Sequence, residues 1–293
     1  MNWHLLWAQI LAGIANGGLY FLVASGLTLL WGALGVVNLA HGSFFMLAAY
    51  AQAMCIQTWG PEVGFFIGLT AVPMVIAALD MTFEVSLFRP VYRTGIWGQL
   101  LFSFGLVLAL NNITRILFGI TALSMPPPRF LRGYIEVLGV RLATYQFWIL
   151  GLTSLVAVFL WYLLSASRTG RLIRAAVDDS QMLEAVGVDV RRLRTTVMGV
   201  AAMLAGIAGA AAVPRGAINL EMDTQIVVIA FAVIVIGGLG SVWASLFSAL
   251  IIGVAETVVT MFVNQGGEIV IFALMILLLL IRPTGLRTIA GRE

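Results

Sequence analysis

The residues best suited to chemistry are a few charged side chains within long apolar stretches. Asp80 and Glu84 are four positions apart, which places them on one face of a helix, and Glu256 lies alone in another apolar stretch. Charged groups inside a membrane are costly, so they usually line a pathway or pair with one another. Asp80 and Glu84 could therefore serve a pathway or pair with Arg89 or Arg93, and Glu256 could line a pathway or contact another subunit.

Histidine and cysteine offer little further chemistry. His41 could relay protons because histidine titrates near neutral pH, but a bond from its ring to a backbone carbonyl in the turn is the simpler interpretation. His4 and His41 lack metal-ligand spacing, and the single cysteine, Cys55, excludes an intramolecular disulfide or a cysteine-rich metal site. The sequence contains no nucleophile–base pair and no Gly-x-x-x-x-Gly-Lys-Ser/Thr phosphate loop. We expect no enzymatic activity, no cofactor and no metal, so any ATP hydrolysis must occur in another chain.

The elements that position these residues must lie in a membrane. The chain has 293 residues, of which 61% are hydrophobic and 10% charged, and its mean hydropathy is +1.04. Soluble domains are about 45–50% apolar and about 25% charged. A spanning helix needs about 20 apolar residues, so this length allows about eight or nine spans. The apolar stretches are 5–31, 43–59, 64–88, 97–118, 146–165, 195–213, 225–239, 242–263 and 268–281.

These stretches predict an all-α, polytopic membrane protein, with residues 1–293 forming a single transmembrane domain. The shortest stretch, 225–239, could be re-entrant or a broken helix. Residues 1–4 lack the basic segment of a signal peptide, so we expect the first stretch to remain in the mature protein. Gly199, Gly206 and Gly209 alternate with alanines in 195–213, a pattern typical of closely packed membrane helices.

Arginine positions predict the orientation. All 16 basic residues are arginines, and they gather at the ends of apolar stretches rather than on a nucleic-acid-binding face. Eleven lie in the segment 89–93, the loop 168–194 and the C-terminal tail with Arg282, Arg287 and Arg292. Since cytoplasmic loops are rich in arginine and lysine, we expect these three segments inside and the N-terminus outside. Loop 119–145 is then external, and its Pro126-Pro127-Pro128 run favours an extended or polyproline path.

Loop 168–194 contains the signals of a short helix. Asp178 or Asp179 is a suitable N-cap, with Gln181 at capping-box distance from Asp178. Gly187 is a natural helix end, and Asp189 can cap the following helix. A helix of about seven residues is unstable alone in water, so it must pack on another surface.

Three apolar residues of this short helix, Met182, Leu183 and Val186, could provide that packing. They could pack on the inner face of the same chain or dock on a separate cytoplasmic protein. A rigid cytoplasmic helix of this kind could transmit motion between two proteins.

Two glycine-rich segments resemble each other. Residues Gly32-Ala33-Leu34-Gly35-Val36-Val37 are echoed by Gly237-Gly238-Leu239-Gly240-Ser241-Val242. In the predicted orientation both are tight inner turns. Transporter folds often contain internal repeats, with substrate sites at unwound segments between them.

Taken in order, these motifs resemble the permeases of branched-chain amino acid transporters of the ATP-binding-cassette class. The matching segments cover most of the chain; they are Gly18-Leu19-Tyr20, Gly26-Leu27-Thr28, Asn38-Leu39-Ala40-His41-Gly42, the loop from Gly170 to Gly187, Ala205-Gly206-Ile207-Ala208-Gly209 and the turn from Gly237 to Val242. Ser43 departs from the pattern, because many relatives carry glutamate after the His-Gly pair.

The resemblance implies a multi-pass importer permease of the bacterial cytoplasmic (inner) membrane. Its expected partners are a homologous second permease in a heterodimer, cytoplasmic ATPase subunits, a periplasmic or extracellular solute-binding protein and the lipid bilayer, but no nucleic acid. Expected substrates are branched-chain amino acids, with urea, amides or aromatic acids as alternatives. A self-sufficient secondary carrier is the alternative from another class.

Two groups of residues follow from the resemblance and the local patterns. Coupling to the ATPase is expected at Gly170, Arg171, Arg174, Asp178, Asp179, Met182, Leu183, Ala185, Val186 and Gly187. The translocation pathway is expected at Asn38, His41, Gly42, Ser43, Gly237, Gly238, Gly240 and Glu256.

Overall fold

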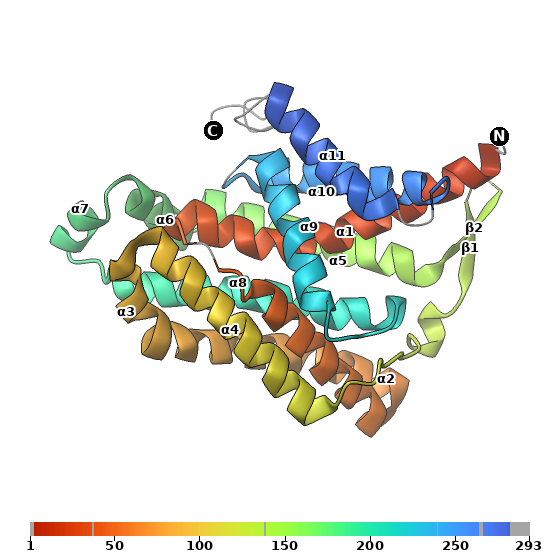
Figure 1. Ribbon diagram of the computed structural model, residues 1–293, viewed down its shortest axis with the longest axis horizontal. Coiled ribbons are helices and arrows are strands. Elements are labelled where there is room, and N and C mark those ends of the chain that lie inside the picture. Colours follow the sequence, from red (N-terminus) through yellow and green to blue (C-terminus); the bar gives the residue numbers. More distant parts are fainter. Residues whose placement is uncertain (1–2, 37, 138, 239, 264–265, 282–293) are drawn as a thin grey trace.

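The computed structural model describes residues 3–36, 38–137, 139–238, 240–263 and 266–281 as a bundle of apolar helices (Figure 1). Five segments are long and apolar enough to cross a membrane, and shorter apolar helices accompany them. The predicted all-α, polytopic fold is confirmed. The principal helices are α1 (Trp3–Leu34), α2 (His41–Phe83), α4 (Gly95–Phe118), α5 (Thr144–Trp161), α8 (Val190–Ala212), α9 (Met222–Gly237), α10 (Val242–Thr260) and α11 (Gly266–Ile281).

The predicted stretch 43–59 and most of the stretch 64–88 fall within the single element α2, and residues 84–88 form the π-helix that follows it. Helix α2 is broken inside at Gly60, whose φ of 81° and ψ of 167° are not helical, and Pro61 follows. Proline lacks the N–H that would continue the helical hydrogen bonds. Across the break, the side-chain amide of Gln52 donates to the carbonyl of Phe65 at 3.1 Å. The predicted boundary between the two stretches is therefore a sharp, internally bonded turn.

Close helix packing depends on glycine, as the sequence pattern predicted. A Cβ on Gly13 would lie 2.6 Å from the Cα of Val254, so α1 and α10 approach backbone to backbone. A Cβ on Gly206 would lie 2.8 Å from the Cα of Pro73, and one on Gly209 would overlap the carbonyl oxygen of Phe45, so α8 packs equally closely on α2. Lipid chains provide no hydrophobic driving force for helix association. Small residues stabilise these crossings instead, because they allow close van der Waals packing.

Short elements connect the long helices. They are the π-helix η1 (Glu84–Phe88), α3 (Arg89–Val91), the 3-10 helices η2 (Tyr92–Thr94) and η3 (Arg129–Leu131), the strands β1 (Tyr134–Val137) and β2 (Val140–Ala143), the π-helix η4 (Tyr162–Ala166), α6 (Arg168–Asp178), α7 (Ser180–Ala185) and the 3-10 helix η5 (Val213–Arg215). β1 and β2 form an antiparallel hairpin in which Val137 pairs with Val140, and Gly139 in the turn has a φ of 78°. A two-residue hairpin turn favours such a glycine. The hairpin was not predicted, whereas Pro128 has the expected extended backbone, with φ −53° and ψ 151°.

The connecting segments separate to opposite ends of the bundle. Figure 1 shows α3, α6 and α7 together at the left and the N-terminal end of α1 with the hairpin at the right. We call the first the arginine-rich end, because it carries segments 89–93 and 168–194. Arg282, Arg287 and Arg292 of the tail lie outside the described residues. The two internal arginine-rich segments thus lie at the same end of the bundle, as predicted. Which end faces the cytoplasm stays a prediction.

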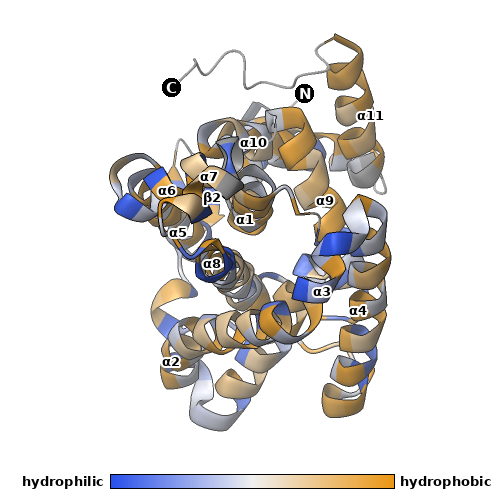
Figure 2. Cartoon of the chain, turned by 90° about the vertical axis from the view of Figure 1, so that its left-hand side faces the viewer, coloured by the Kyte–Doolittle hydropathy of each residue, from blue (hydrophilic) through white to orange (hydrophobic). Residues whose placement is uncertain are grey.

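The flank of the bundle is apolar. Figure 2, which views the molecule from the arginine-rich end, shows apolar residues along α4 and α11 at the outside of the bundle. On α4, large side chains such as Leu101 (75% exposed) and Ile116 (82%) face outward. An exposed apolar surface of this extent is suited to contact with lipid chains or another membrane helix.

Candidate functional site

A non-helical segment runs through the interior of the bundle between α1 and α2. Gly35, with a φ of 62°, turns the chain back after α1 ends. The ring Nε2 of His41 then lies 3.1 Å from the carbonyl oxygen of Val23, nine residues before Gly32 on α1. Nine helical residues correspond to about 14 Å, so the chain returns toward the middle of α1 before α2 begins. Non-helical backbone at this depth is typical of segments that line a substrate site.

The polar residues of this segment are fully buried. His41 and Asn38 are 1% and 0% exposed. The side-chain oxygen of Asn38 accepts from the backbone N–H of Ala40 at 3.0 Å, while its side-chain nitrogen has no hydrogen-bond partner among the described residues. The His41 ring is bonded to a backbone carbonyl, as the simpler interpretation predicted. The carbonyl belongs to Val23 of α1, however, rather than to the turn. Asn38 therefore offers one buried donor.

The starts of α2 and α9 meet beside this segment. A Cβ on Gly42 would overlap the carbonyl oxygen of Asp223. The carboxylate of Asp223, a residue only 2% exposed, accepts from the hydroxyl of Ser43 at 3.3 Å and from the side-chain amide of Asn111 at 3.2 Å. It also accepts from the backbone N–H of Thr224 at 2.7 Å. The carboxylate is stabilised by these donors and by its place in the first turn of α9, where negative charge is favoured.

Asp223 and Asn111 were missed by sequence reasoning. Asp223 borders the apolar stretch 225–239 and resembles an ordinary helix-start residue, and Asn111 lies within a predicted span. An acidic residue immediately before a short apolar run was the available signal. The contact also gives a physical reason for a serine at position 43. The hydroxyl of serine donates to the carboxylate of Asp223, whereas a glutamate would place a second carboxylate against it.

The two glycine-rich segments that resemble each other lie in contact. A Cβ on Gly32 would lie 2.7 Å from the Cα of Gly240, so no side chain fits between the turns. Gly35 and Gly240 occupy equivalent places in the two segments, and both have positive φ, 62° and 85°. Gly238 has a φ of 90°, and Gly237 packs on α10, where a Cβ would lie 2.9 Å from the carbonyl of Ala244.

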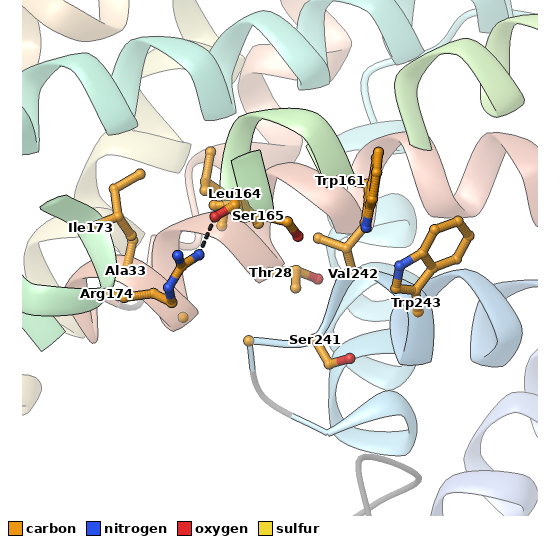
Figure 3. A pocket seen from close by; sticks show the side chains of 13 residues that line it. Thr28, Ala33, Trp161, Leu164, Ser165, Ile173, Arg174, Ser241, Val242 and Trp243 are labelled. Carbon is orange, nitrogen blue, oxygen red and sulfur yellow. Dashed lines mark hydrogen bonds between the residues drawn. The ribbon is translucent and has the colours of Figure 1, made fainter. Parts of the chain in front are cut away.

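A cavity of about 210 Å³ opens beside the Gly240 turn (Figure 3). Thr28 of α1, Trp161 of α5 and Arg174 of α6 contribute to its lining. Arg174 donates through its guanidinium to the carbonyl of Leu164, as the dashed line in Figure 3 marks. The other lining residues are Leu29, Gly32, Ala33, Leu164, Ser165, Ile173, Gly240, Ser241, Val242 and Trp243. The structure therefore brings a predicted coupling residue, Arg174, and a predicted pathway residue, Gly240, to one cavity.

Helix α6 is held firmly against η4, the π-helix that continues α5. The hydroxyl of Ser167 accepts from the backbone N–H of Gly170 at 3.0 Å and caps α6. Arg171 donates to the carbonyl of Ala166 at 3.2 Å, so both predicted flanking arginines bond to carbonyls of their own chain. A Cβ on Gly170 would overlap the carbonyl oxygens of Leu163 and Leu164. Only glycine permits this approach.

The predicted N-cap at Asp179, the helix end at Gly187 and the cap of α8 at Asp189 are confirmed, whereas the side chain of Gln181 lies outside the described residues. The carboxylate of Asp179 accepts from the backbone N–H of Met182 at 3.0 Å, and that of Asp189 accepts from Arg192 at 3.0 Å. Gly187 ends the short helix with a φ of 86°. The side chain of Asp178 lies outside the described part of the chain.

The three apolar residues of α7 do not share one surface. Leu183 is 8% exposed and packs in the core of its own chain, which corrects the prediction that it docks elsewhere together with the other two. Met182 and Val186 are 67% and 68% exposed and lie one helical turn apart. Ala185 and Gly187 are also exposed. Leu183 therefore anchors α7, and Met182 and Val186 form an outward apolar edge.

Glu256 belongs to a polar cluster between α1 and α10. The hydroxyl of Tyr20 donates to its carboxylate at 2.5 Å. One turn earlier on α1, the side-chain nitrogen of Asn16 donates to Thr257 at 3.1 Å, and its oxygen accepts from Arg215. Glu256 thus contacts α1, as His41 does through Val23 and Gly240 does through Gly32. Helix α1 is therefore the common element of these three predicted pathway residues.

Glu84 is paired, whereas its neighbour Asp80 is not fully satisfied. The carboxylate of Glu84 lies 3.4 Å from the guanidinium of Arg89 and also accepts from the hydroxyl of Thr195. Asp80 is 1% exposed, and one of its oxygens has no hydrogen-bond partner in the described structure. Pairing with Arg89 is therefore confirmed for Glu84.

Comparison with known proteins identifies relatives along nearly the whole chain. Residues 9–279 match the family described as branched-chain amino acid transport system / permease component. The high-affinity branched-chain amino acid transport system permease protein LivH of Escherichia coli K12 is 28% identical, with 95% of this chain and 94% of that protein aligned. The corresponding BraD of Pseudomonas aeruginosa is 29% identical over the same shares. LivM of E. coli K12 is 24% identical over 92% of this chain and 67% of its own length. No solved structure matches significantly.

Proposed function

The chain belongs to the permease-component family of branched-chain amino acid transport systems, and from this premise we propose that it forms one half of the pathway of an ATP-driven importer in the bacterial inner membrane. As a family member it is a multi-pass transport subunit rather than an enzyme. The substrate we propose is a branched-chain amino acid, because the names of LivH and BraD give that substrate class for those relatives.

The cavity in Figure 3 is the observation that carries this proposal. Its lining joins the Gly240 turn, which contacts α1, to Arg174 of α6. Helix α6 is bonded to η4, which continues α5, and leads directly into α7 with its exposed apolar edge. A partner that pushes on α7 would therefore move the wall of the cavity. Coupling of hydrolysis in one chain to passage through another requires such a rigid connection.

The interior segment between α1 and α2 supports a pathway for a zwitterion. Helix starts favour negative groups, and discontinuous membrane helices commonly direct their N-termini at a substrate carboxylate. The start of α2 and the free donor of Asn38 lie together at this segment. We propose that the substrate carboxylate passes here.

A homologous second permease is the proposed membrane partner. The chain resembles both LivH and LivM of one organism, which are two permease proteins of a high-affinity branched-chain amino acid transport system. We propose a heterodimer of such permeases, two cytoplasmic ATPase subunits below it and a solute-binding protein on the hairpin side. The exposed apolar faces of α4 and α11 are available for the second permease or for lipid.

ATP-driven uptake tests the function. In proteoliposomes containing the chain, its second permease, the ATPase and the binding protein, we expect leucine uptake only when ATP reaches the ATPase. Gly170→Ala should reduce that uptake about 5- to 150-fold, because overlap with two carbonyls displaces α6 and overpacking costs about 1–3 kcal/mol. Gly151→Ala on α5, where no atom lies within 4 Å of the new Cβ, is the matched control and should transport normally. Uptake without ATP would instead indicate a secondary carrier.

Orientation is tested by labelling from outside. In a Cys55→Ala background, a cysteine replacing Phe130, which is 55% exposed near the hairpin, should react with a membrane-impermeant maleimide in intact cells. A cysteine replacing Arg192, whose side chain is 88% exposed at the arginine-rich end, should react only after the membrane is permeabilised. The reverse pattern would place the arginine-rich end outside and contradict the proposed coupling side.

A further inference from the structure

A second cavity lies at the arginine-rich end, between the connection from α2 to α4 and the start of α8. Its volume is about 580 Å³. Four arginines line it, Arg89 and Arg93 from one segment and Arg191 and Arg194 from the other, together with Glu84 and Glu184. The amino acid pathway proposed above does not use this cavity.

The cavity has an excess of positive charge. Glu84 already accepts from Arg89 and Thr195, and Glu184 belongs to α7 and is exposed. Among the charged groups that line the cavity, four cations thus face two carboxylates, one of which is already paired. Arginine is the residue best suited to phosphate, because its planar guanidinium donates two parallel hydrogen bonds.

Two donors in the cavity wall have no acceptor. The guanidinium carbon of Arg194 lies 4.5 Å from the ring centre of Tyr92, which fixes the two side chains face to face. Nε of Arg194 and the hydroxyl of Tyr92 are buried without a hydrogen-bond partner in the described part of the chain. Burial raises the pKa of Tyr92, with the carboxylate of Glu84 acting in the same direction, so its hydroxyl remains a donor at neutral pH. Buried donors of this kind usually have an acceptor, and the described residues supply none.

The cavity adjoins a surface suited to lipid chains. Val85, which lines it, is 48% exposed, and Leu87 on the same π-helix is 40% exposed. Trp97, four residues after Arg93 at the start of α4, is 81% exposed. Tryptophan at the end of a spanning helix is typical of the membrane–water interface. A positively charged cavity next to exposed apolar residues fits an amphiphile better than a free anion.

We propose that this cavity binds the phosphate headgroup of an anionic phospholipid of the cytoplasmic leaflet. The four arginines hold the phosphate, Tyr92 and Arg194 donate to its oxygens, and the acyl chains lie along Val85, Leu87 and Trp97. Basic pockets on the cytoplasmic side of membrane helices bind such headgroups. The inference rests on the proposed orientation and not on the substrate, so it can hold even if the test of leucine uptake fails.

Binding of phosphatidylglycerol to the purified, full-length chain, measured by native mass spectrometry against phosphatidylcholine, tests this proposal. We expect the Arg93→Gln/Arg191→Gln variant to bind phosphatidylglycerol about 30-fold more weakly than the natural chain, on the basis of the usual contribution of each arginine near an anionic surface. Both side chains are exposed, so the variant should fold, and its melting temperature without lipid verifies this. Arg93→Gln alone should weaken binding about fivefold.

The control is Arg168→Gln/Arg192→Gln, which removes two exposed arginines from the same end but outside the cavity. It should bind phosphatidylglycerol as the natural chain does. Equal weakening in both double variants would mean that only general charge matters, and it would overturn the proposal. Competition by inorganic phosphate at the concentration at which phosphatidylglycerol binds would also overturn it, because the acyl chains would then contribute nothing.

Discussion

Ala185→Arg is expected to release the ATPase from the permease and to abolish ATP-driven uptake, while the permease still inserts into the membrane. Ala185 is exposed on α7, between Met182 and Val186 of the outward apolar edge. The helix has six residues, which correspond to about 9 Å, a length that suits insertion into a groove. A long cation at the centre of such a contact removes about 2–4 kcal/mol, or about 30- to 1,000-fold in association.

The fold should tolerate this change, because α7 is anchored by the buried Leu183 and capped by Asp179, and neither is altered. Co-purification of the ATPase with the tagged permease and ATP-driven leucine uptake are the two measurements. Ala217→Arg is the matched control: it makes the same substitution at an exposed alanine just after η5, far along the chain from α7, and should leave both measurements unchanged. Natural ATPase binding and uptake by Ala185→Arg would mean that α7 is not the docking element.

The helices were predictable from the sequence, because length and hydropathy alone distinguish a membrane span from other structure. Even the division of α2 was visible, since Gly60 and Pro61 stand between two apolar stretches. The hairpin was not predicted, because the rigid proline run that precedes it favours an extended path, although alternating residues around Gly139 were a usable signal.

The caps of α7 were also predictable, because a cap depends on residues only three positions apart. The burial of Leu183 was not, since neighbouring residues on a short helix give no indication of which one turns toward the bundle. The site around Asp223 was not predictable either. Its partners Ser43 and Asn111 come from two other helices, and their meeting depends on which helices pack together. The glycine echo was the exception, since a sequence resemblance between segments did correspond to a contact between Gly32 and Gly240.

Gly42→Ala is expected to abolish transport without preventing insertion. The added methyl group would overlap the carbonyl oxygen of Asp223 and lie 3.0 Å from the Cβ of Val227, so the start of α9 must move away from α2. Because this obstacle is backbone, no side-chain rotation can relieve it. Movement of α9 would separate Asp223 from Ser43 and Asn111, which leaves a buried carboxylate with fewer donors.

The large contacts of the bundle, α1 with α10 and α2 with α8, lie elsewhere and should survive, so the variant should reach the membrane at natural levels. We expect leucine uptake to fall at least about 50-fold, since misplacing a site by about 1 Å commonly costs that much. Gly105→Ala on α4 makes the same substitution where no atom lies within 4 Å of the new Cβ. It should transport normally and gain slightly in helix propensity. If Gly42→Ala transported as fast as Gly105→Ala, the contact between the starts of α2 and α9 would have no part in the pathway, and Asp223 would be a structural residue only.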